Sequence, residues 1–200
     1  MSRISTSGMI RSGRSRNSAE DAGGMKKKRS EVILAGSGGQ GLVVSGTMLA
    51  EAAILEGKNV VQTVSYGIAT RGGFSMSGVI IDREEIIFQE VENADLILAL
   101  TEEALEKFRP QAGPGTEIYY DTTLMKERRE GHLHGHPFTE MAGRLGHVGM
   151  ANIIALGCMA QQSGMVSADS LVEVIRQRFS GKTLEMNLRA LEAGKGLATG

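Results

Sequence analysis

The sequence predicts an α/β protein with a Rossmann-like, mixed but mostly parallel sheet, helices on both faces and a helical C-terminal part. Short apolar runs alternate with helix-length segments as far as residue 121. The glycine cluster GSGGQG at 36–41 joins the first apolar run directly to the first of these segments. From residue 138 onward, apolar residues recur at the three- and four-residue spacing of helices.

The apolar runs and their flanking residues place the elements in order. The first helix should stop at Gly57, and Thr101 is the expected N-cap of the acidic segment that follows it. We expect strands over 32–35, 59–65, 76–81, 95–100 and 116–121, with 85–88 pairing with 76–81. We expect helices over 42–55, 102–108, 138–146, 150–164, 168–179 and 184–198.

Composition excludes several classes of protein. The single cysteine, Cys158, allows no internal disulfide and no cysteine-ligated iron–sulfur cluster from this chain alone; we expect it to be a small core residue. A cytoplasmic, reducing location is predicted. Aromatic residues make up 4% of the chain, which argues against a base-stacking nucleic-acid module. Because no apolar run approaches the roughly 20 residues of a membrane span, we expect no membrane partner.

The beginning of the chain differs from the rest. Residues 1–30 hold eight Lys/Arg against two Asp/Glu, whereas the whole chain has a net charge of -1. This Ser-, Gly- and Arg-rich segment lacks apolar periodicity and predicts a disordered basic extension over 1–29, followed by one domain over 30–200. An upstream-start artefact, with Met25 as the natural start, and a functional basic arm are the alternatives.

The stretch 36–41 fits the pattern G-x-G-x-x-G between a strand and a helix. Glycines allow a tight turn and let N–H groups approach a phosphate, and the helix N-terminus adds its dipole. A dinucleotide fold also needs an acidic residue about 20 residues later. The second strand offers Gln62, Thr63 and Ser65 instead, so a phosphate-bearing ligand other than NAD is favoured. A glycine turn that serves only helix–strand packing is the alternative.

A second loop, SYGIATRGG at 65–73, follows the second strand and should open on the same edge of the sheet. Arg71, followed by Gly72 and Gly73, could bind a phosphate or carboxylate in bidentate fashion. A hairpin turn with a surface arginine is the alternative.

Five motifs in order, GSGGQG, LAEAA, YGIATRGG, VENADLILAL and MANIIALG, resemble the gamma subunit of 2-oxoacid:ferredoxin oxidoreductases, which is also the gamma domain of pyruvate:ferredoxin oxidoreductase. The resemblance covers about 31–194 and leaves the N-terminal extension outside. GxGGQG together with RGG is specific for this family.

The resemblance implies a subunit that is not active alone. Such complexes oxidatively decarboxylate a 2-oxoacid, transfer the acyl group to coenzyme A and reduce ferredoxin. The resemblance places thiamine diphosphate, Mg and [4Fe-4S] clusters in alpha, beta and ferredoxin-like delta partner subunits, with CoA as a substrate and no cofactor bound by this chain alone. Among 2-oxoacids, 2-oxoglutarate is favoured.

The resemblance implies no catalytic base, nucleophile or metal ligand in this chain. It implies a composite site for CoA or for a partner subunit, in which Arg71 contacts an anion and Gln40 hydrogen-bonds a ligand or a facing subunit. The residues carried over are Gly36, Ser37, Gly38, Gly39, Gln40, Gly41, Tyr66, Arg71, Gly72 and Gly73, with Asn152 and Asn187 in support.

Two other functions are considered. A stand-alone NAD(P)-dependent oxidoreductase would lack the acidic residue that binds the ribose, and a non-enzymatic nucleotide-binding or assembly module would need no catalytic residues.

His132, His134 and His136 would share one face of an extended strand and could bind a metal. Flanking Gly and Pro residues favour a solvated loop there instead. We expect the side chains of Asn152 and Asn187 to be satisfied by a capping or inter-helix contact rather than by a ligand.

Overall fold

The computed structural model describes residues 29–67, 73–128 and 130–198. Its six-stranded sheet has the order β2-β3-β1-β4-β5-β6. The strands are β1 (Arg29–Ser37), β2 (Asn59–Tyr66), β3 (Phe74–Asp82), β4 (Leu96–Ala99), β5 (Glu117–Asp121) and β6 (Leu133–His136). The helices are α1 (Leu42–Leu55), α2 (Glu102–Phe108), α3 (Phe138–Leu145), α4 (Ala151–Ser163), α5 (Ala168–Arg178) and α6 (Gly181–Leu197), with 3-10 turns η1 (Arg109–Gln111) and η2 (Val148–Met150).

The sheet is mixed, as predicted. β1, β4, β5 and β6 pair in parallel, whereas β3 pairs antiparallel with both β1 and β2. β2 therefore runs in the same direction as β1 but is separated from it by β3. The carboxyl ends of the five parallel strands meet at one edge, because Ser37 of β1 pairs with Phe74 and Tyr66 of β2 pairs with Ser75.

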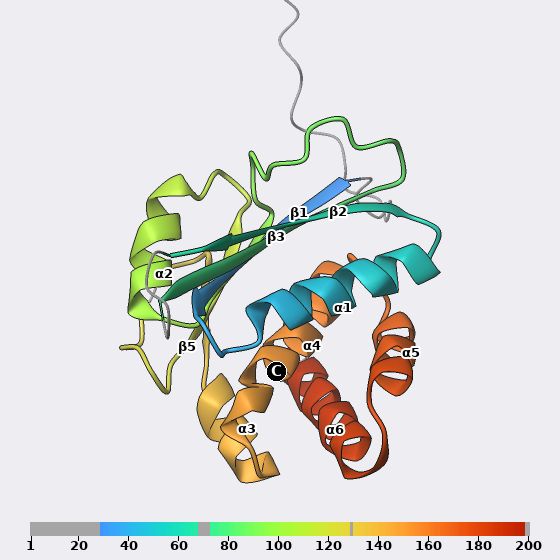
Figure 1. Cartoon of the computed structure of the whole chain (residues 1–200). Helices are drawn as coiled ribbons and strands as arrows, with labels where there is room; N and C mark the ends of the chain where they lie inside the picture. Colours follow the sequence, from blue (N-terminus) through green and yellow to red (C-terminus); the bar gives the residue numbers. More distant parts are fainter. Residues whose placement is uncertain (1–28, 68–72, 129, 199–200) are drawn as a thin grey trace, which may run out of the picture.

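Helices cover both faces of the sheet unequally (Figure 1). Val32 and Leu34 of β1 point into the larger core, which is shared with α1 and with α3 to α6. Ile33 and Ala35 point into a smaller core under α2. The alternation of side chains along a strand explains why this central strand is a continuous apolar run: each face is buried.

Two local predictions are wrong. Residues 85–88 do not form a strand beside β3, because both edges of β3 are already paired. The histidine segment is not a loop, because Leu133–His136 forms the edge strand β6. Gly135 there has a packing role: a Cβ at this position would lie 2.6 Å from the hydroxyl oxygen of Tyr120.

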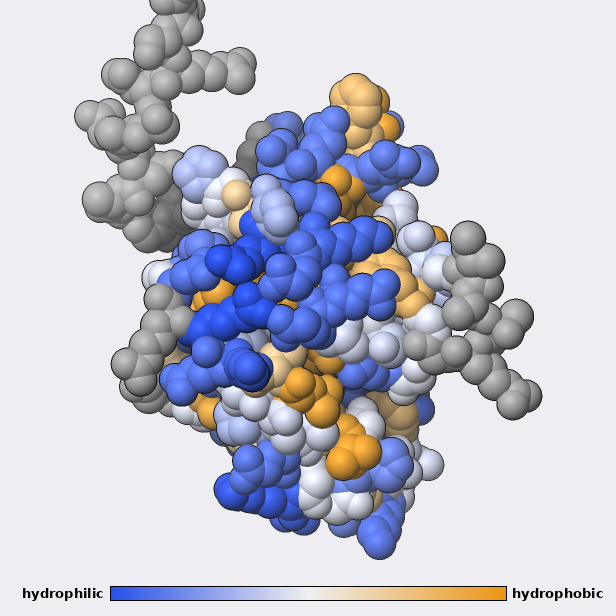
Figure 2. Space-filling model, turned by 90° about the vertical axis from the view of Figure 1, so that its left-hand side faces the viewer, coloured by the Kyte–Doolittle hydropathy of each residue, from blue (hydrophilic) through white to orange (hydrophobic). Residues whose placement is uncertain are grey.

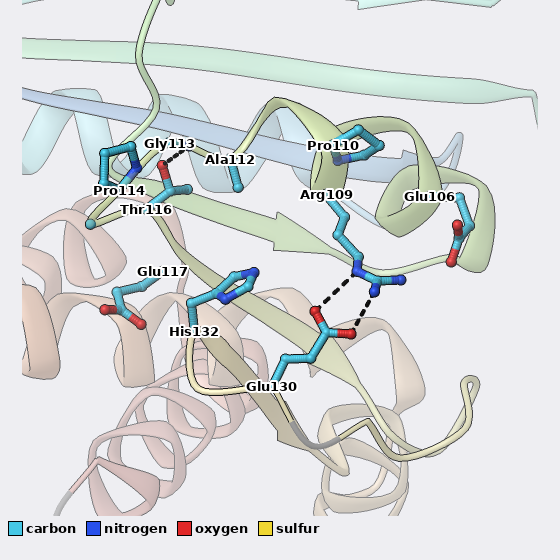
Figure 3. A pocket seen from close by; sticks show the side chains of 11 residues that line it. Glu106, Arg109, Pro110, Ala112, Gly113, Pro114, Thr116, Glu117, Glu130 and His132 are labelled. Atoms are coloured by element: carbon cyan, nitrogen blue, oxygen red, sulfur yellow. Dashed lines mark hydrogen bonds and ion pairs between the residues drawn. The ribbon is translucent and has the colours of Figure 1, made fainter.

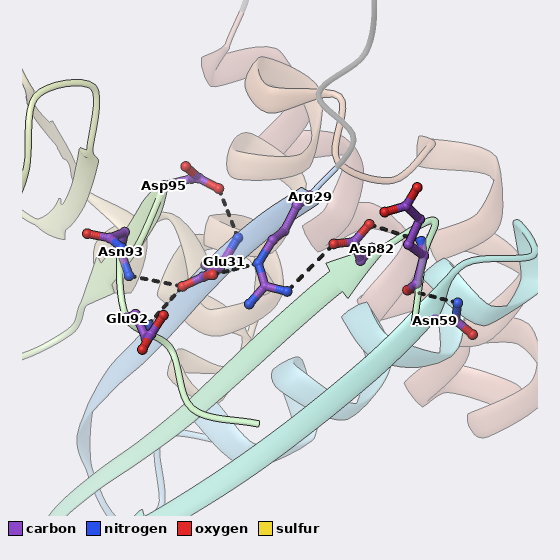
Figure 4. Close-up of polar contacts among 8 residues, drawn as sticks. Arg29, Glu31, Asn59, Asp82, Glu92, Asn93 and Asp95 are labelled. Atoms are coloured by element: carbon purple, nitrogen blue, oxygen red, sulfur yellow. Dashed lines mark hydrogen bonds and ion pairs between the residues drawn. The ribbon is translucent and has the colours of Figure 1, made fainter. Parts of the chain in front are cut away.

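A polar cluster secures the amino end of β1 (Figure 4). The Glu31 carboxylate accepts the N–H groups of Glu92 and Asn93 and pairs with Arg29 at 2.7 Å. Burial alone would raise the pKa of Glu31, but these hydrogen bonds outweigh burial and lower it. The N–H of Glu31 donates to Asp95, so the segment before β4 is fixed at the edge opposite the glycine turn.

Helices α4 and α6 approach each other at backbone distance. A Cβ on Gly194 would lie 1.9 Å from the carbonyl oxygen of Ile154, and a Cβ on Gly157 would lie 2.4 Å from that of Leu191. The two glycines therefore set the spacing of the helix pair that covers the larger core. No helix in the described part of the chain is long and apolar enough to cross a membrane.

We expect Gly194→Ala to lower the free energy of unfolding by about 2–3 kcal/mol, because the added methyl meets backbone rather than a movable side chain. Gly196→Ala is the matched control in the same helix, since its Cβ would meet nothing within 4 Å. The Gly196→Ala variant should be at least as stable as the wild-type protein, because alanine favours a helix more than glycine does. Urea unfolding measures both; equal stability of the two variants would contradict the close helix contact.

Candidate functional site

The glycine turn leaves the carboxyl end of β1 at the point where the chain order of the sheet reverses. From β1, the α1 crossover leads to β2 on one side, whereas β4 lies on the other side. In open α/β sheets, ligands bind outside the carboxyl ends of the strands at such a switch point. This edge therefore holds the candidate site, and the predicted position of the two loops on one edge is confirmed.

The side chain of Gln40 lies inside the turn. Its Oε1 accepts the N–H of Ser37 at 2.7 Å, and its Nε2 donates to the carbonyl of Leu100 at 3.1 Å. A Cβ at Gly36 would lie 2.3 Å from that Oε1. Gly36 thus makes room for the amide, and the amide joins the turn to the end of β4. The predicted contact of Gln40 with a ligand or facing subunit stays a prediction.

Asn152, at the start of α4, secures the other end of the turn. Its side chain is buried, and its Nδ2 donates to the carbonyl of Gly41 at 3.1 Å. The same carbonyl accepts the N–H of Ser45 at 2.9 Å, the first hydrogen bond of α1. Gly41 has φ +72°, and a Cβ there would lie 2.2 Å from Nδ2. This contact between elements agrees with the satisfied role expected of Asn152.

The two predicted loops touch each other. The N–H of Gly38 donates to the carbonyl of Gly73 at 2.8 Å, and the N–H of Gly67 donates to Phe74 at 2.7 Å. Tyr66, which ends β2, is 69% exposed at this edge. Arg71 and Gly72 lie outside the described residues, so their predicted roles stay predictions. Three N–H groups of the turn, those of Ser37, Gly38 and Gln40, donate within the protein.

A cavity of about 210 Å³ opens beside the turn. Both α1 and α4 begin at its border, and neither has an acidic residue in its first turn. Helix N-termini without acidic residues in their first turns favour an anion. The third helix that begins at this cavity, α3, differs from them because its first turn contains Glu140. The cavity is lined by Gly39, Gln40, Leu100, Leu124, Thr139, Val148, Gly149 and Ala151.

The side of the molecule that carries α2 is mainly hydrophilic with separate hydrophobic areas (Figure 2). Of the residues that line the cavity, Leu124 is 52% exposed and Val148 is 59% exposed. Two exposed apolar side chains thus border the cavity beside the glycine turn.

Asp121, at the end of β5, is a site-supporting residue that sequence reasoning missed. This fully buried carboxylate accepts the N–H groups of Thr123 and Thr139 at 2.9 and 3.0 Å. It therefore fixes both the loop after β5 and the start of α3, which border the cavity. Its position at the carboxyl end of an apolar run was the available signal.

A larger cavity, of about 490 Å³, lies at the opposite edge of the sheet (Figure 3). It is bordered by the loop before β5 and by His132, which precedes β6. Arg109 is already paired there with both carboxylate oxygens of Glu130, at 2.5 and 3.2 Å. Because its arginine is neutralised and it lies at the amino ends of the strands, this cavity is a poorer candidate for an anionic ligand.

The other candidates have structural roles. Asn187 is buried and donates to the Thr183 carbonyl within its own helix at 2.8 Å, so the capping or inter-helix contact expected of it stays a prediction. Cys158 is fully buried, and burial raises the pKa of its thiol to about 11, which confirms that it is a core residue.

The histidines of β6 contact neighbouring side chains: His134 pairs with Glu117 at 2.5 Å and stacks on Tyr119. Burial is the main cause that lowers the pKa of His136, and the neighbouring His134 lowers it further.

The fold and this edge define a Rossmann-like α/β protein whose candidate site lies at a switch point of the sheet. A family model of pyruvate ferredoxin/flavodoxin oxidoreductase matches residues 31–197. The 2-oxoglutarate synthase subunit KorC of Archaeoglobus fulgidus is 41% identical over 164 residues, which cover 82% of this chain and 84% of the relative.

Two solved structures are similar. The gamma subunit of a keto/oxoacid ferredoxin oxidoreductase from Geobacter sulfurreducens has a TM-score of 0.73 at 33% identity, covering 85% of this chain and 98% of that one. A 2-oxoglutarate:ferredoxin oxidoreductase from Magnetococcus marinus, with 2-oxoglutarate, coenzyme A and succinyl-CoA bound, has a TM-score of 0.78 at 26% identity. The matched region covers 86% of this chain and 31% of the longer Magnetococcus chain. The chain belongs to the pyruvate ferredoxin/flavodoxin oxidoreductase family, which confirms the predicted resemblance.

We expect Gly41→Ala to destabilise the protein by about 1–3 kcal/mol more than Gly39→Ala, because only at Gly41 does the new Cβ meet Asn152. Both positions have positive φ, so both variants bear the same kind of backbone penalty, ~1–2 kcal/mol. In an Asn152→Ala background the difference should largely disappear, as urea unfolding of the double-mutant cycle would show. A difference that persists without the Asn152 side chain would contradict the contact.

Proposed function

We propose that this chain is the gamma subunit of a thiamine-diphosphate-dependent, CoA-acylating 2-oxoacid:ferredoxin oxidoreductase. The complex would oxidatively decarboxylate a 2-oxoacid to the acyl-CoA and reduce ferredoxin. The name of the Archaeoglobus relative supports 2-oxoglutarate as the substrate. In this proposal, the carboxyl edge of the sheet forms part of the face that receives CoA.

One observation carries the CoA assignment: two helix N-termini border one cavity beside the glycine turn, with no acidic residue in either first turn. CoA bears phosphate groups, which helix N-termini and backbone N–H groups bind well. The CoA bound in the Magnetococcus relative supports the same ligand class. Arg71 is proposed to contact a CoA phosphate or a partner carboxylate.

The role of the chain in the reaction is positioning. The described turn carries no carboxylate, histidine, lysine or cysteine that could move a proton or form a covalent intermediate. The chemistry supplied by thiamine diphosphate, Mg and iron–sulfur clusters is assigned to alpha, beta and delta partner subunits. The described residues hold no group of three His, Cys, Asp or Glu that could bind a metal ion, and the single cysteine lies in the core.

The topology makes an NAD(P) site a weaker alternative. A dinucleotide fold uses the end of the strand adjacent to β1 for the ribose. Here β3 lies between β1 and β2, so the end of β2 is about 10 Å from β1, two strand spacings away. Gln62 of β2 also donates to Val43 and Ser77 inside the protein.

We expect Arg71→Ala, in the complex reassembled with its co-expressed alpha and beta subunits, to raise the KM for CoA about tenfold and to leave the KM for 2-oxoglutarate within twofold. Loss of one charge-assisted contact of about 1.4 kcal/mol gives this factor. The assay is CoA-dependent reduction of ferredoxin by the purified complex.

Arg144→Ala is the control, because Arg144 is 75% exposed and pairs only with Glu140 on its own helix in the described structure. An Arg71 variant with an unchanged KM for CoA would contradict the role of Arg71. The function itself would be contradicted if the isolated chain oxidised a substrate with NAD, or if no alpha and beta subunits co-purified with it.

A further inference from the structure

The glycine turn is held from two sides by side-chain amides, and one of these amides comes from a distant helix. Gln40 lies within the turn, whereas Asn152 is 111 residues away from the carbonyl it binds. We infer that Asn152 is a positioning residue that fixes the glycine turn and the start of α1 for the CoA-receiving face.

The contacts of Asn152 couple two helix N-termini through one amide. Its Oδ1 accepts the N–H of Ile153 at 2.8 Å, one of the N–H groups that the first turn of α4 leaves without an intrahelical acceptor. Its Nδ2 donates to the Gly41 carbonyl, which also receives the first hydrogen bond of α1. A single side chain therefore links the two helix starts by hydrogen bonds.

The glycine pattern itself shows that these amides shape the turn. Gly36 and Gly41 are the positions where a Cβ would collide with Gln40 and Asn152, at 2.3 and 2.2 Å. At Gly39 a Cβ would have nothing within 4 Å, and Gly39 lines the cavity at this edge. Two glycines of the turn, Gly36 and Gly41, thus admit internal amides, whereas Gly39 borders the cavity.

Removing the Asn152 amide would leave the Gly41 carbonyl without one of its two donors and the N–H of Ile153 without its acceptor. The turn would then sample other positions, and binding that depends on its exact placement would weaken. Because the 2-oxoacid is handled by partner subunits in the proposed function, its binding should not change. The inference rests on that proposed function for its kinetic test.

The experiment compares Asn152→Ala with Asn187→Ala in the reassembled complex. The two residues are both 5% exposed, but the hydrogen bond that Asn187 makes among the described residues goes to Thr183 of its own helix, outside the turn. Asn152→Ala should raise the KM for CoA about tenfold with the KM for 2-oxoglutarate and kcat within twofold. Asn187→Ala should leave both KM values within twofold, even if it lowers Tm as much.

Asn152→Asp sharpens the result, because it keeps the shape but presents an oxygen to the Gly41 carbonyl. It should raise the KM for CoA at least as much as Asn152→Ala does. An unchanged KM for CoA in both Asn152 variants, or an equal rise in Asn187→Ala, would overturn the inference.

Hydrogen exchange of the full chain without CoA separates this inference from the proposed function. The peptide spanning 36–45 should exchange at least fivefold faster in Asn152→Ala than in Asn187→Ala. If the wild-type complex needs no CoA but this difference appears, the positioning role stands and the function is wrong. Equal exchange in the two variants would overturn the positioning role whatever the substrate.

Discussion

Two side-chain amides that bind backbone groups of the glycine turn are the constraint on which the rest of the site depends. Gln40 joins the N–H of Ser37 to the carbonyl of Leu100, and Asn152 holds the carbonyl from which α1 begins. Each such hydrogen bond contributes only about 1 kcal/mol to stability. Their larger effect is geometric, because together they fix the ends of β1 and β4 and the starts of α1 and α4 relative to one another.

The mixed sheet explains why the site gathers at one edge. Antiparallel β3 fills the position beside β1, so the crossover through α1 reaches β2 one strand farther out. This leaves the ends of β1 and β4 adjacent at the switch point, with α1 and α4 beginning above them. Asp121 then fixes the loop after β5 and the start of α3 around the same cavity. The glycine turn at this edge carries no carboxylate, histidine, lysine or cysteine of its own.

Much of this could be predicted from the sequence, because local patterns determine it. The helix Leu42–Leu55 and the cap at Thr101 are confirmed, as is the shared edge of the two loops. Three features depend on distant residues and could not be predicted. The position of β3 between β1 and β2 excludes a strand at 85–88, the Tyr120 ring explains Gly135, and Asn152 explains Gly41. The glycines of the pattern were interpreted as room for a phosphate, whereas two of them make room for side-chain amides.

The central claim of the proposed function is that this chain supplies a fixed turn and that partner subunits complete the CoA-binding face. Hydrogen exchange of the peptide 36–45, with and without saturating CoA, tests it most directly. We predict that CoA slows exchange of this peptide in the assembled complex and has no effect on it in the isolated chain. Exchange that CoA leaves unchanged in the complex, or slows equally in the isolated chain, would contradict the claim.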